Sequence, residues 1–358
     1  MKKLLLVSDI MSGQGGTEFV VAKTLKLLKK NYGVESKIFL HGRDKTSHFE
    51  WLRDLDHNIE FTTFRNHKLQ QLQTAWRLAK RIKQYKPDCL VAVTPISVYI
   101  ASLARMFLRS KIKIIAWPHI NIDYKKKYFA LADNCLAIST GIHRGLTACG
   151  ISPDAIALVF NPVTAVDVVI PRPATCRFLY VGRVTFHGQK CLKDLFDAAR
   201  DLHGDWSVDI VGGGEDVEQC QRYVDQLGIS DRITWHGWKQ QPWEYVAYNI
   251  GEVSALVQCS SYEGFPLVLI ESLMRGVCCI ASNCESGPED IIEHGVNGFL
   301  FEPHDIDGLC SIMQKLIDGG EIPSPAVLKQ SVAIHADDIF AERFYHALCQ
   351  FSGASINS

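Results

Sequence analysis

Short apolar runs alternate with helical patterns along the whole chain. Runs rich in Val, Ile and Leu are the length of buried strands, and each is followed by a segment with helical periodicity. Such an alternation is typical of βαβ units with parallel sheets and predicts an α/β protein of two Rossmann-like domains in tandem. The runs cover 4–7, 34–40, 89–93, 111–117, 134–139 and 155–160, and then 176–182, 206–212, 233–237, 253–259, 277–282 and 298–302.

A turn-rich segment, NPVTAVDVVIPRPAT at 161–175, interrupts this pattern and is the natural linker. We expect an N-terminal Rossmann-like domain at 1–165, a C-terminal one at 166–335, and a helix at 336–358 that packs back toward the N-terminal domain. The first apolar run is interrupted by Asp9, which favours a strand over a signal peptide. The apolar window 89–108 contains Pro95 and Arg105, so it predicts strand, turn and helix rather than a membrane span.

Cysteine and charge distribution narrow the class of protein. The twelve cysteines form no CxxC pair and the thirteen histidines no HExxH motif, so we expect a reducing, cytoplasmic environment and no metal. The net charge is −1, but residues 1–165 hold 25 Lys and Arg against 12 Asp and Glu, and residues 166–358 hold 13 against 27. The halves thus carry +13 and −14. Either the opposite charges help the two domains to dock, or the first domain works beside an anionic surface or substrate.

The first strand is followed by a glycine-rich turn, SGQGGTEF at 12–19. Gly15 and Gly16 lead into a helix that starts near Thr17, where backbone amides and the helix dipole can meet an anion. The same glycines could instead permit close packing of strand and helix. A Walker A loop is excluded because the GxxxxGK[ST] order is missing, and an oxidoreductase is disfavoured because the GxGxxG order is missing as well.

The start of the second domain, YVGRVTFHGQK at 180–190, places two cations after a strand. Arg183 and Lys190 can point into the crevice at the strand ends and stabilise a diphosphate leaving group. The alternative is a surface salt bridge. The glycines at 212–214 follow the next strand and would let a ligand approach the backbone, and the loop at Gly237 could pair with the edge of a base.

The stretch SSYEGFPLVLIESL at 260–273 carries two acids around a helix start. Glu263 stands in the loop before Pro266, which suits the first helical turn, and Glu271 lies about 7.5 Å further along the axis. Carboxylates accept hydrogen bonds from vicinal hydroxyls, so the pattern suits a nucleotide sugar, with one glutamate for the sugar and one for the ribose. The alternative is a helix with two incidental glutamates. Between them, the free amides of Phe265, Leu267 and Val268 could donate to sugar hydroxyls and phosphate oxygens, and Gly264 and Pro266 complete this candidate donor-binding stretch.

EGFPLVLIE, with seven residues between its acids, resembles the E-x7-E signature of retaining GT-B glycosyltransferases of family 4. GGTE, GRV, VGGGE, HGW and NGFLFEP occur in that family's order. The resemblance covers nearly the whole chain and implies a GT-B fold, in which two Rossmann-like domains face each other across a cleft. It also implies a UDP-sugar donor, retention of the anomeric configuration without a protein nucleophile, and no metal or other cofactor. The sequence contains no convincing DxD motif.

The resemblance assigns roles to matching residues. It implies that Glu263 binds the hydroxyls of the transferred sugar, that Glu271 binds those of the ribose, and that His119 in WPHIN contacts the donor sugar. The diphosphate would be bound by Arg183, Lys190, Gly15 and Gly16. The family's lysine comes sooner after the arginine and is followed by glycine, whereas here Lys190 precedes Cys191, so Lys193 is a possible substitute.

Within the family, the likeness is to enzymes of the enterobacterial lipopolysaccharide core. It implies transfer of galactose from UDP-galactose to a glucose of the outer core in an α-1,6 linkage. Alternatives are transfer of glucose or N-acetylglucosamine, a UDP-sugar epimerase, and a non-catalytic nucleotide-binding module. No nucleic-acid partner is expected.

A basic amphipathic helix is predicted at 67–86. Its apolar stripe either packs on the sheet of the first domain or contributes to membrane contact. Its cations can in either case hold the protein peripherally against anionic lipid at the cytoplasmic face of the inner membrane. The stripe consists of Leu69, Leu72, Trp76, Ala79 and Ile82.

Overall fold

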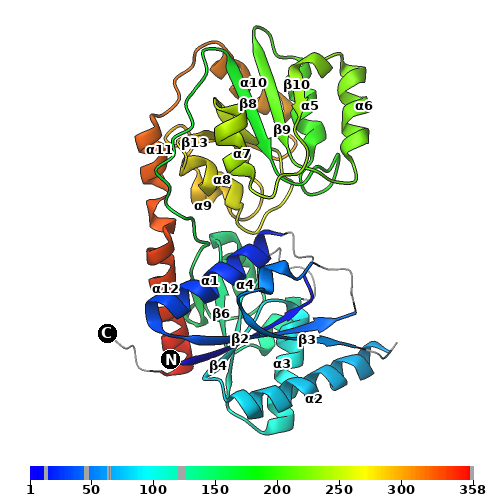
Figure 1. Cartoon of the computed structure of the whole chain (residues 1–358), viewed down its shortest axis with the longest axis vertical. Coiled ribbons are helices and arrows are strands. Elements are labelled where there is room, and N and C mark those ends of the chain that lie inside the picture. The colour runs from blue at the N-terminus through cyan, green and yellow to red at the C-terminus, as the bar shows by residue number, and fades with distance from the viewer. Residues whose placement is uncertain (12–14, 44–47, 63, 65, 120–125, 355–358) are drawn as a thin grey trace. The chain divides into compact units, whose positions relative to one another are not determined.

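A computed structural model describes the chain except for residues 12–14, 44–47, 63, 65, 120–125 and 355–358 (Figure 1). Its contacts divide the chain into two compact units. The first comprises Met1–Pro162 together with Asp337–Ser358, and the second comprises Val163–Ala336. Each unit is a parallel sheet with helices, as the alternating pattern predicts.

The first unit contains a seven-stranded sheet with the strand order β3-β2-β1-β4-β5-β6-β7. Its strands are β1 (Lys3–Asp9), β2 (Glu35–Gly42), β3 (Asp56–Phe61), β4 (Cys89–Ala92), β5 (Lys113–Ala116), β6 (Asn134–Ala137) and β7 (Ile156–Leu158). Its α-helices are α1 (Gly16–Tyr32), α2 (His67–Tyr85), α3 (Pro95–Leu108), α4 (Thr140–Ala148) and α12 (Asp337–Ser352).

The second unit contains a six-stranded sheet with the order β10-β9-β8-β11-β12-β13. Its strands are β8 (Cys176–Val181), β9 (Trp206–Val211), β10 (Ile233–Trp235), β11 (Ala255–Gln258), β12 (Cys278–Ser282) and β13 (Gly298–Phe301). Its α-helices are α5 (Leu192–Arg200), α6 (Val217–Leu227), α7 (Pro242–Tyr245), α8 (Leu267–Leu273), α9 (Pro288–Ile291), α10 (Ile306–Ile317) and α11 (Pro325–Ser331).

The central strands β4, β11 and β12 are buried at every position, as expected for strands that helices cover on both faces. They are apolar except at the last residues of β11 and β12, Gln258 and Ser282. β3 was not predicted. It is an edge strand with the sequence DHNIEF and no fully buried residue, so it lacks the apolar run that identified the others.

The C-terminal helix α12 belongs to the first unit. Tyr345 stacks on Tyr32 of α1 with ring centroids 4.0 Å apart, and Phe344 packs edge-on against Trp117 at 4.8 Å. The chain therefore returns to its first unit after completing the second.

The predicted amphipathic helix is present as α2, but only two residues of its predicted apolar stripe, Ala79 and Ile82, lie on the buried face. Its buried residues are Thr74, Ala75, Leu78, Ala79 and Ile82. The other three stripe residues, Leu69, Leu72 and Trp76, are exposed by 50, 45 and 53%. Thr74 and Ala75 join Leu78 on the buried face although their own hydrophobic signal is weak, which explains why the predicted stripe differs from the buried one. Of the helices that the structure describes, none combines the length and the apolar character that a bilayer crossing demands.

Candidate active site

The loop after β8 carries Arg183 and is fixed by the loop after β9. The Gly182 amide donates to the Val211 carbonyl at 3.1 Å and the Val184 amide to the Gly213 carbonyl at 2.9 Å. A Cβ atom at Gly212 or at Gly214 would collide with the carbonyl oxygens of residues 182 and 184. These glycines were predicted to admit a ligand, but here they admit the backbone that presents Arg183.

Arg183 itself is exposed at the carboxyl end of β8. The Tyr180 hydroxyl donates to its carbonyl oxygen at 2.6 Å, and burial holds the pKa of that phenol well above its ordinary value, so Tyr180 stays a neutral donor. Among the residues that the structure describes, the Arg183 guanidinium has no ion-pair partner. The surface salt bridge considered as an alternative is thus not observed there, and the cation is available to an anionic ligand.

Lys190 and Glu263 form the centre of the candidate site. The Lys190 Nζ atom lies 2.6 Å from Glu263 Oε1, and Gln258 Nε2 donates to the same oxygen at 2.9 Å. The pair is largely buried, with side-chain exposures of 19 and 8%. Lys193, the possible substitute, instead pairs with Asp197 one helical turn away. Lys190 is therefore the lysine that lies beside the first glutamate of the E-x7-E motif.

Gln258 was missed by the sequence analysis. It is the last residue of β11, and it is buried with its Oε1 atom unpartnered in the described part of the chain. Its position at a strand end, five residues before Glu263, was the available signal. The loops that carry Lys190 and Glu263 are also joined by the Ser261 amide, which donates to the Gln189 carbonyl at 2.9 Å.

The GFP turn leads into α8, which begins one residue later than predicted. Pro266 is the N-cap, and Leu267 and Val268 are the first two helical residues. Their N–H groups have no acceptor within the helix, as the candidate diphosphate contact requires. The neighbouring loop fixes the turn, because the Ser286 hydroxyl donates to the Gly264 carbonyl at 2.9 Å. Phe265 is buried and packs edge-on against His335.

Glu271 lies on α8 and its carboxylate is held by an aromatic side chain. Trp243 of α7 donates its indole N–H to Glu271 Oε2 at 2.8 Å. Arg275 donates to the Glu271 carbonyl and places its guanidinium 5.0 Å from the Trp243 ring. The sequence analysis missed Trp243, because a contact between residues this far apart leaves no local pattern.

The loop after β10 contains Gly237, whose φ of +70° lies in the left-handed region that favours glycine. The preceding His236 bonds Asp209 through Nε2 at 2.6 Å and Tyr245 through Nδ1 at 3.1 Å. The loop is thus anchored on both sides of the histidine, which fits a backbone that presents itself to a ligand.

The remaining predicted residues lie in the first unit. Gly15 is the N-cap of α1 and Gly16 its first residue. A Cβ atom at Gly15 would meet Glu18 Oε2 at 2.6 Å, so a buried carboxylate shares this helix start with any phosphate. The third glycine of the turn, Gly13, lies outside the described residues.

His119 follows β5 and is almost completely buried. Its ring lies 4.4 Å from that of Trp117. Burial lowers its pKa from 6.5 to about 3, so the imidazole is neutral at neutral pH. Its Nε2 atom is buried and has no hydrogen-bond partner within the described residues. This leaves a polar atom that a bound sugar can satisfy.

One group of described side chains has the geometry of a metal site, with ligand atoms within 4.8 Å of one another: Cys191, Asp194 and His304. Asp194 Oδ2 already lies 2.9 Å from His304 Nδ1. Burial raises the pKa of the Cys191 thiol, which disfavours the thiolate that a metal binds. Activity without a metal stays a prediction.

Comparison with known proteins identifies the family of this chain over most of its length. The family model "Glycosyl transferases group 1" matches residues 174–330, and "Glycosyltransferase Family 4" matches residues 14–165. The chain is 36% identical to the lipopolysaccharide 1,6-galactosyltransferase of Escherichia coli K12, covering 97% of this chain and 96% of the relative. Its identity to the Salmonella typhimurium protein of the same name is 33%, covering 97% and 98%.

Solved structures agree with this placement. The apo form of the lipopolysaccharide outer core galactosyltransferase WaaB superposes with a TM-score of 0.92 at 32% identity, covering 97% of this chain and 99% of that chain. Anabaena Alr3699/HepE in complex with UDP shares the fold, with a TM-score of 0.80 at 16% identity over 98% and 100%. The chain therefore belongs to glycosyltransferase family 4, with two parallel-sheet, Rossmann-like units of the GT-B fold.

Proposed function

We propose that the chain transfers galactose from UDP-galactose, with retention of configuration, to a glucose of the lipopolysaccharide outer core in an α-1,6 linkage. Two relatives of more than 30% identity over nearly the full length are named lipopolysaccharide 1,6-galactosyltransferases. The observation that supports a working site is the buried contact between Lys190 and Glu263. The residue proposed to bind the diphosphate thus lies beside the residue proposed to bind the sugar, as transfer from a nucleotide sugar demands.

The mechanism follows from the positions of these groups. Departure of UDP concentrates negative charge on the diphosphate, and Arg183 and Lys190 supply cations against it. The first amides of α8 add donors beside them. Glu263 accepts hydrogen bonds from hydroxyls of the sugar, while Glu271, oriented by Trp243, accepts those of the ribose. Positioning and charge stabilisation lower the barrier without a protein nucleophile.

The deciding experiment measures UDP release from UDP-galactose, UDP-glucose and UDP-N-acetylglucosamine, with and without lipopolysaccharide truncated after its first outer-core glucose. Acceptor-dependent release from UDP-galactose, lost in Glu263→Gln and kept in the exposed control Glu252→Gln, is the expected result. Release of UDP from another donor alone would show that the transferred sugar is not galactose. Turnover of donor without acceptor would favour an epimerase, and UDP binding without turnover on this acceptor would overturn the proposed reaction.

The protein also works peripherally at the cytoplasmic face of the inner membrane under this proposal. The solvent-facing side of α2 carries Leu69, Leu72 and Trp76, followed by Lys80 and Lys83 at helical spacing. Lys80 places its ammonium 3.5 Å from the Trp76 ring centroid. Aromatic and aliphatic side chains beside exposed lysines are typical of helices that lie in the interface of an anionic bilayer.

Flotation with vesicles of neutral lipid, with and without 30% anionic lipid, tests this contact. Binding should require the anionic lipid, weaken at high salt, and weaken in Trp76→Ser. Tyr248→Ser is the matched control, because Tyr248 is 81% exposed in the second unit. Equal binding at low and high salt, or equal loss in both variants, would contradict the assignment to α2.

A further inference from the structure

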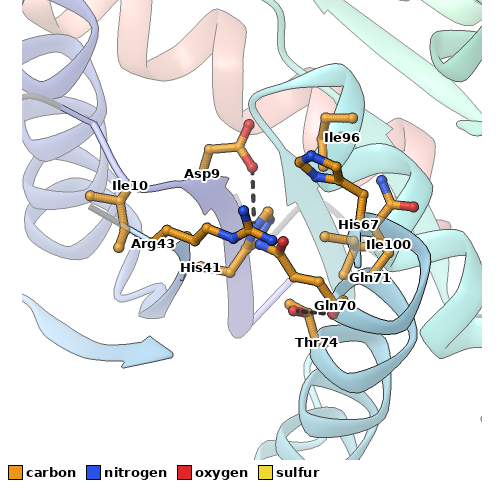
Figure 2. A pocket seen from close by; sticks show the side chains of 11 residues that line it. Asp9, Ile10, His41, Arg43, His67, Gln70, Gln71, Thr74, Ile96 and Ile100 are labelled. Atoms are coloured by element: carbon orange, nitrogen blue, oxygen red, sulfur yellow. Dashed lines mark hydrogen bonds and ion pairs between the residues drawn. The ribbon is translucent and has the colours of Figure 1, made fainter. Parts of the chain in front are cut away.

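A pocket of about 190 Å³ lies within the first unit, at the carboxyl ends of β1 and β2 (Figure 2). In parallel sheets this edge is where ligands bind. The N-terminal turns of α2 and α3 complete the wall. The volume is below the roughly 300–1,000 Å³ of sites for drug-sized ligands and so suits a ligand of about one ring. The lining residues that matter here are Asp9, His41, Arg43, Gln70, Ile96 and Ile100.

Asp9 is the anionic group of this pocket, and both of its oxygens are held from behind. His41 Nδ1 lies 3.2 Å from Oδ1, and the Thr94 hydroxyl donates to Oδ2 at 3.0 Å. The Asp9 side chain nevertheless remains 40% exposed. Each carboxylate oxygen can accept more than one hydrogen bond, so Asp9 keeps acceptor capacity toward the pocket.

The hydrogen-bond chain behind Asp9 fixes the tautomer of His41. His41 is buried, and burial lowers its pKa although the Asp9 charge acts in the opposite direction, so the ring is neutral at neutral pH. His41 Nε2 lies 3.1 Å from the Ser97 hydroxyl. The Ser97 hydroxyl also lies 2.7 Å from the Thr94 hydroxyl, which donates to Asp9. A carboxylate oxygen only accepts hydrogen bonds, so His41 Nδ1 is the nitrogen that donates toward Asp9.

This network of hydrogen bonds would cost free energy if it served stability alone. Buried polar groups must be fully satisfied merely to offset their desolvation, and replacement by apolar residues is often neutral or stabilising. Here buried groups from β2 and α3 orient one carboxylate at a pocket edge. Such an arrangement is expected when a ligand must be met in a fixed geometry.

The other walls define the ligand. Ile10, Ile96 and Ile100 offer an apolar surface, and Arg43 and Gln70 stand among the polar groups. The Gln70 Oε1 atom is buried and accepts no hydrogen bond from the residues that the structure describes. A carboxylate and an amide oxygen together favour a ligand that donates hydrogen bonds. A pyranose ring has that character, because its hydroxyls donate along the edge while its C–H face is apolar.

We propose that this pocket binds a hexopyranose ring of the acceptor glycan, with Asp9 as the carboxylate that selects its hydroxyls and His41 as the residue that positions Asp9. The inference rests on the function proposed above, since it names a subsite of the same reaction. Among the residues that the structure describes, the pocket contains none from the donor motifs in the second unit, so effects on donor binding and on acceptor binding can be measured independently.

The test compares KM values for the truncated lipopolysaccharide and for UDP-galactose in Asp9→Asn, which removes the charge and keeps the shape. The acceptor KM should rise roughly tenfold to a hundredfold, the effect of one hydrogen bond to a charged group, while the donor KM stays within about twofold. The control is Asp54→Asn, an exposed carboxylate paired with Lys26 in the same unit. A rise in the donor KM instead, or equal acceptor KM values in Asp9→Asn and the control, would overturn the pocket assignment.

Two variants separate positioning from folding. His41→Asn keeps an N–H near the position of Nδ1, whereas His41→Ala removes it, so the acceptor KM should be largely restored in the first and raised in the second. Gln70→Ala tests the pocket should Asp9→Asn fail to fold. Calorimetric binding of UDP to the wild type and each variant completes the design. Loss of UDP binding or of donor turnover in the wild type would refute the proposed function, whereas intact UDP binding with an unchanged acceptor KM would refute only the pocket.

Discussion

The contact between Lys190 and Glu263 predicts that stability and activity respond differently to the same substitutions. Lys190→Met removes the ammonium 2.6 Å from Glu263 and leaves the carboxylate with the neutral donor Gln258. Loss of one partner of a fully buried ion pair costs about 3–5 kcal/mol. Water reaches Lys190, which is 19% exposed, so we expect a smaller loss of about 2–3 kcal/mol.

For a unit the size of Val163–Ala336, each kcal/mol changes Tm by about 2–4 °C, so Lys190→Met should lower it by about 4–12 °C. Glu263→Gln should also destabilise this unit. The double variant carries no uncompensated charge and should recover most of the loss, giving a coupling energy above about 1 kcal/mol. Transfer should remain lost in all three variants, because each lacks a donor ligand.

Differential scanning calorimetry of the four proteins, beside acceptor-dependent UDP release, measures both quantities. Lys193→Met is the matched control, since this lysine pairs with Asp197 on the surface of α5 and should lose no more than about 1 kcal/mol and keep transfer activity. If Lys190→Met had the same Tm as the wild type and the double variant showed no coupling energy, the claim that Lys190 and Glu263 form a stabilising buried pair would be refuted. Loss of galactosyl transfer in Lys193→Met alone would show that Lys193, and not Lys190, binds the diphosphate.

Three further predictions concern titration, orientation and metal. The pKa of His119 is about 3 in the folded protein against 6.5 when unfolded, so the free energy of unfolding should fall by about 1.4 kcal/mol per pH unit as the pH drops below 6.5. Denaturant unfolding of His119→Phe should show a weaker dependence of this free energy on pH between pH 6.5 and 5. An equal dependence in wild type and variant would contradict the burial argument. Trp243→Phe removes the donor to Glu271 and should raise the KM for UDP-galactose roughly tenfold with kcat unchanged, whereas a fall in kcat alone would show that Trp243 acts elsewhere. EDTA should leave the rate unchanged; a loss reversed by zinc in the wild type but not in Cys191→Ser would place a required metal at that cysteine.

The architecture could be predicted from the sequence because its strongest signals are local. Strands buried on both faces, such as β11 and β12, are short and nearly continuous apolar runs, and their alternation with helical patterns identifies them. The edge strand β3 was missed because polar residues are acceptable where one side meets water. The apolar stripe of α2 was predicted only in part for a related reason, since Thr74 and Ala75 are buried with little hydrophobic character while Trp76 is exposed.

The candidate site was predictable in its motif residues and not in their partners. Glu263 lies in the loop before α8 and Glu271 on that helix, so their fixed spacing along the chain lets the sequence alone relate them. Gln258 and Trp243 act through contacts that only the packed sheet and helices create. The roles of Gly212 and Gly214 were also misassigned, because a glycine that admits the backbone of a neighbouring loop has the same sequence pattern as one that admits a ligand.

Helix α2 connects the pocket of the first unit with the surface proposed to meet the membrane. At 3.6 residues per turn, Gln70 lies about 160° around the helix from Leu72 and about 120° from Trp76. The pocket therefore opens on one face while the apolar stripe lies on the other, about one helix diameter away, which suits an acceptor sugar separated from its lipid by other sugars. Trp76→Ser should accordingly raise the KM for acceptor embedded in vesicles and leave that for the delipidated core oligosaccharide unchanged. An equal rise for both acceptors would show that the stripe supports the pocket rather than the membrane contact.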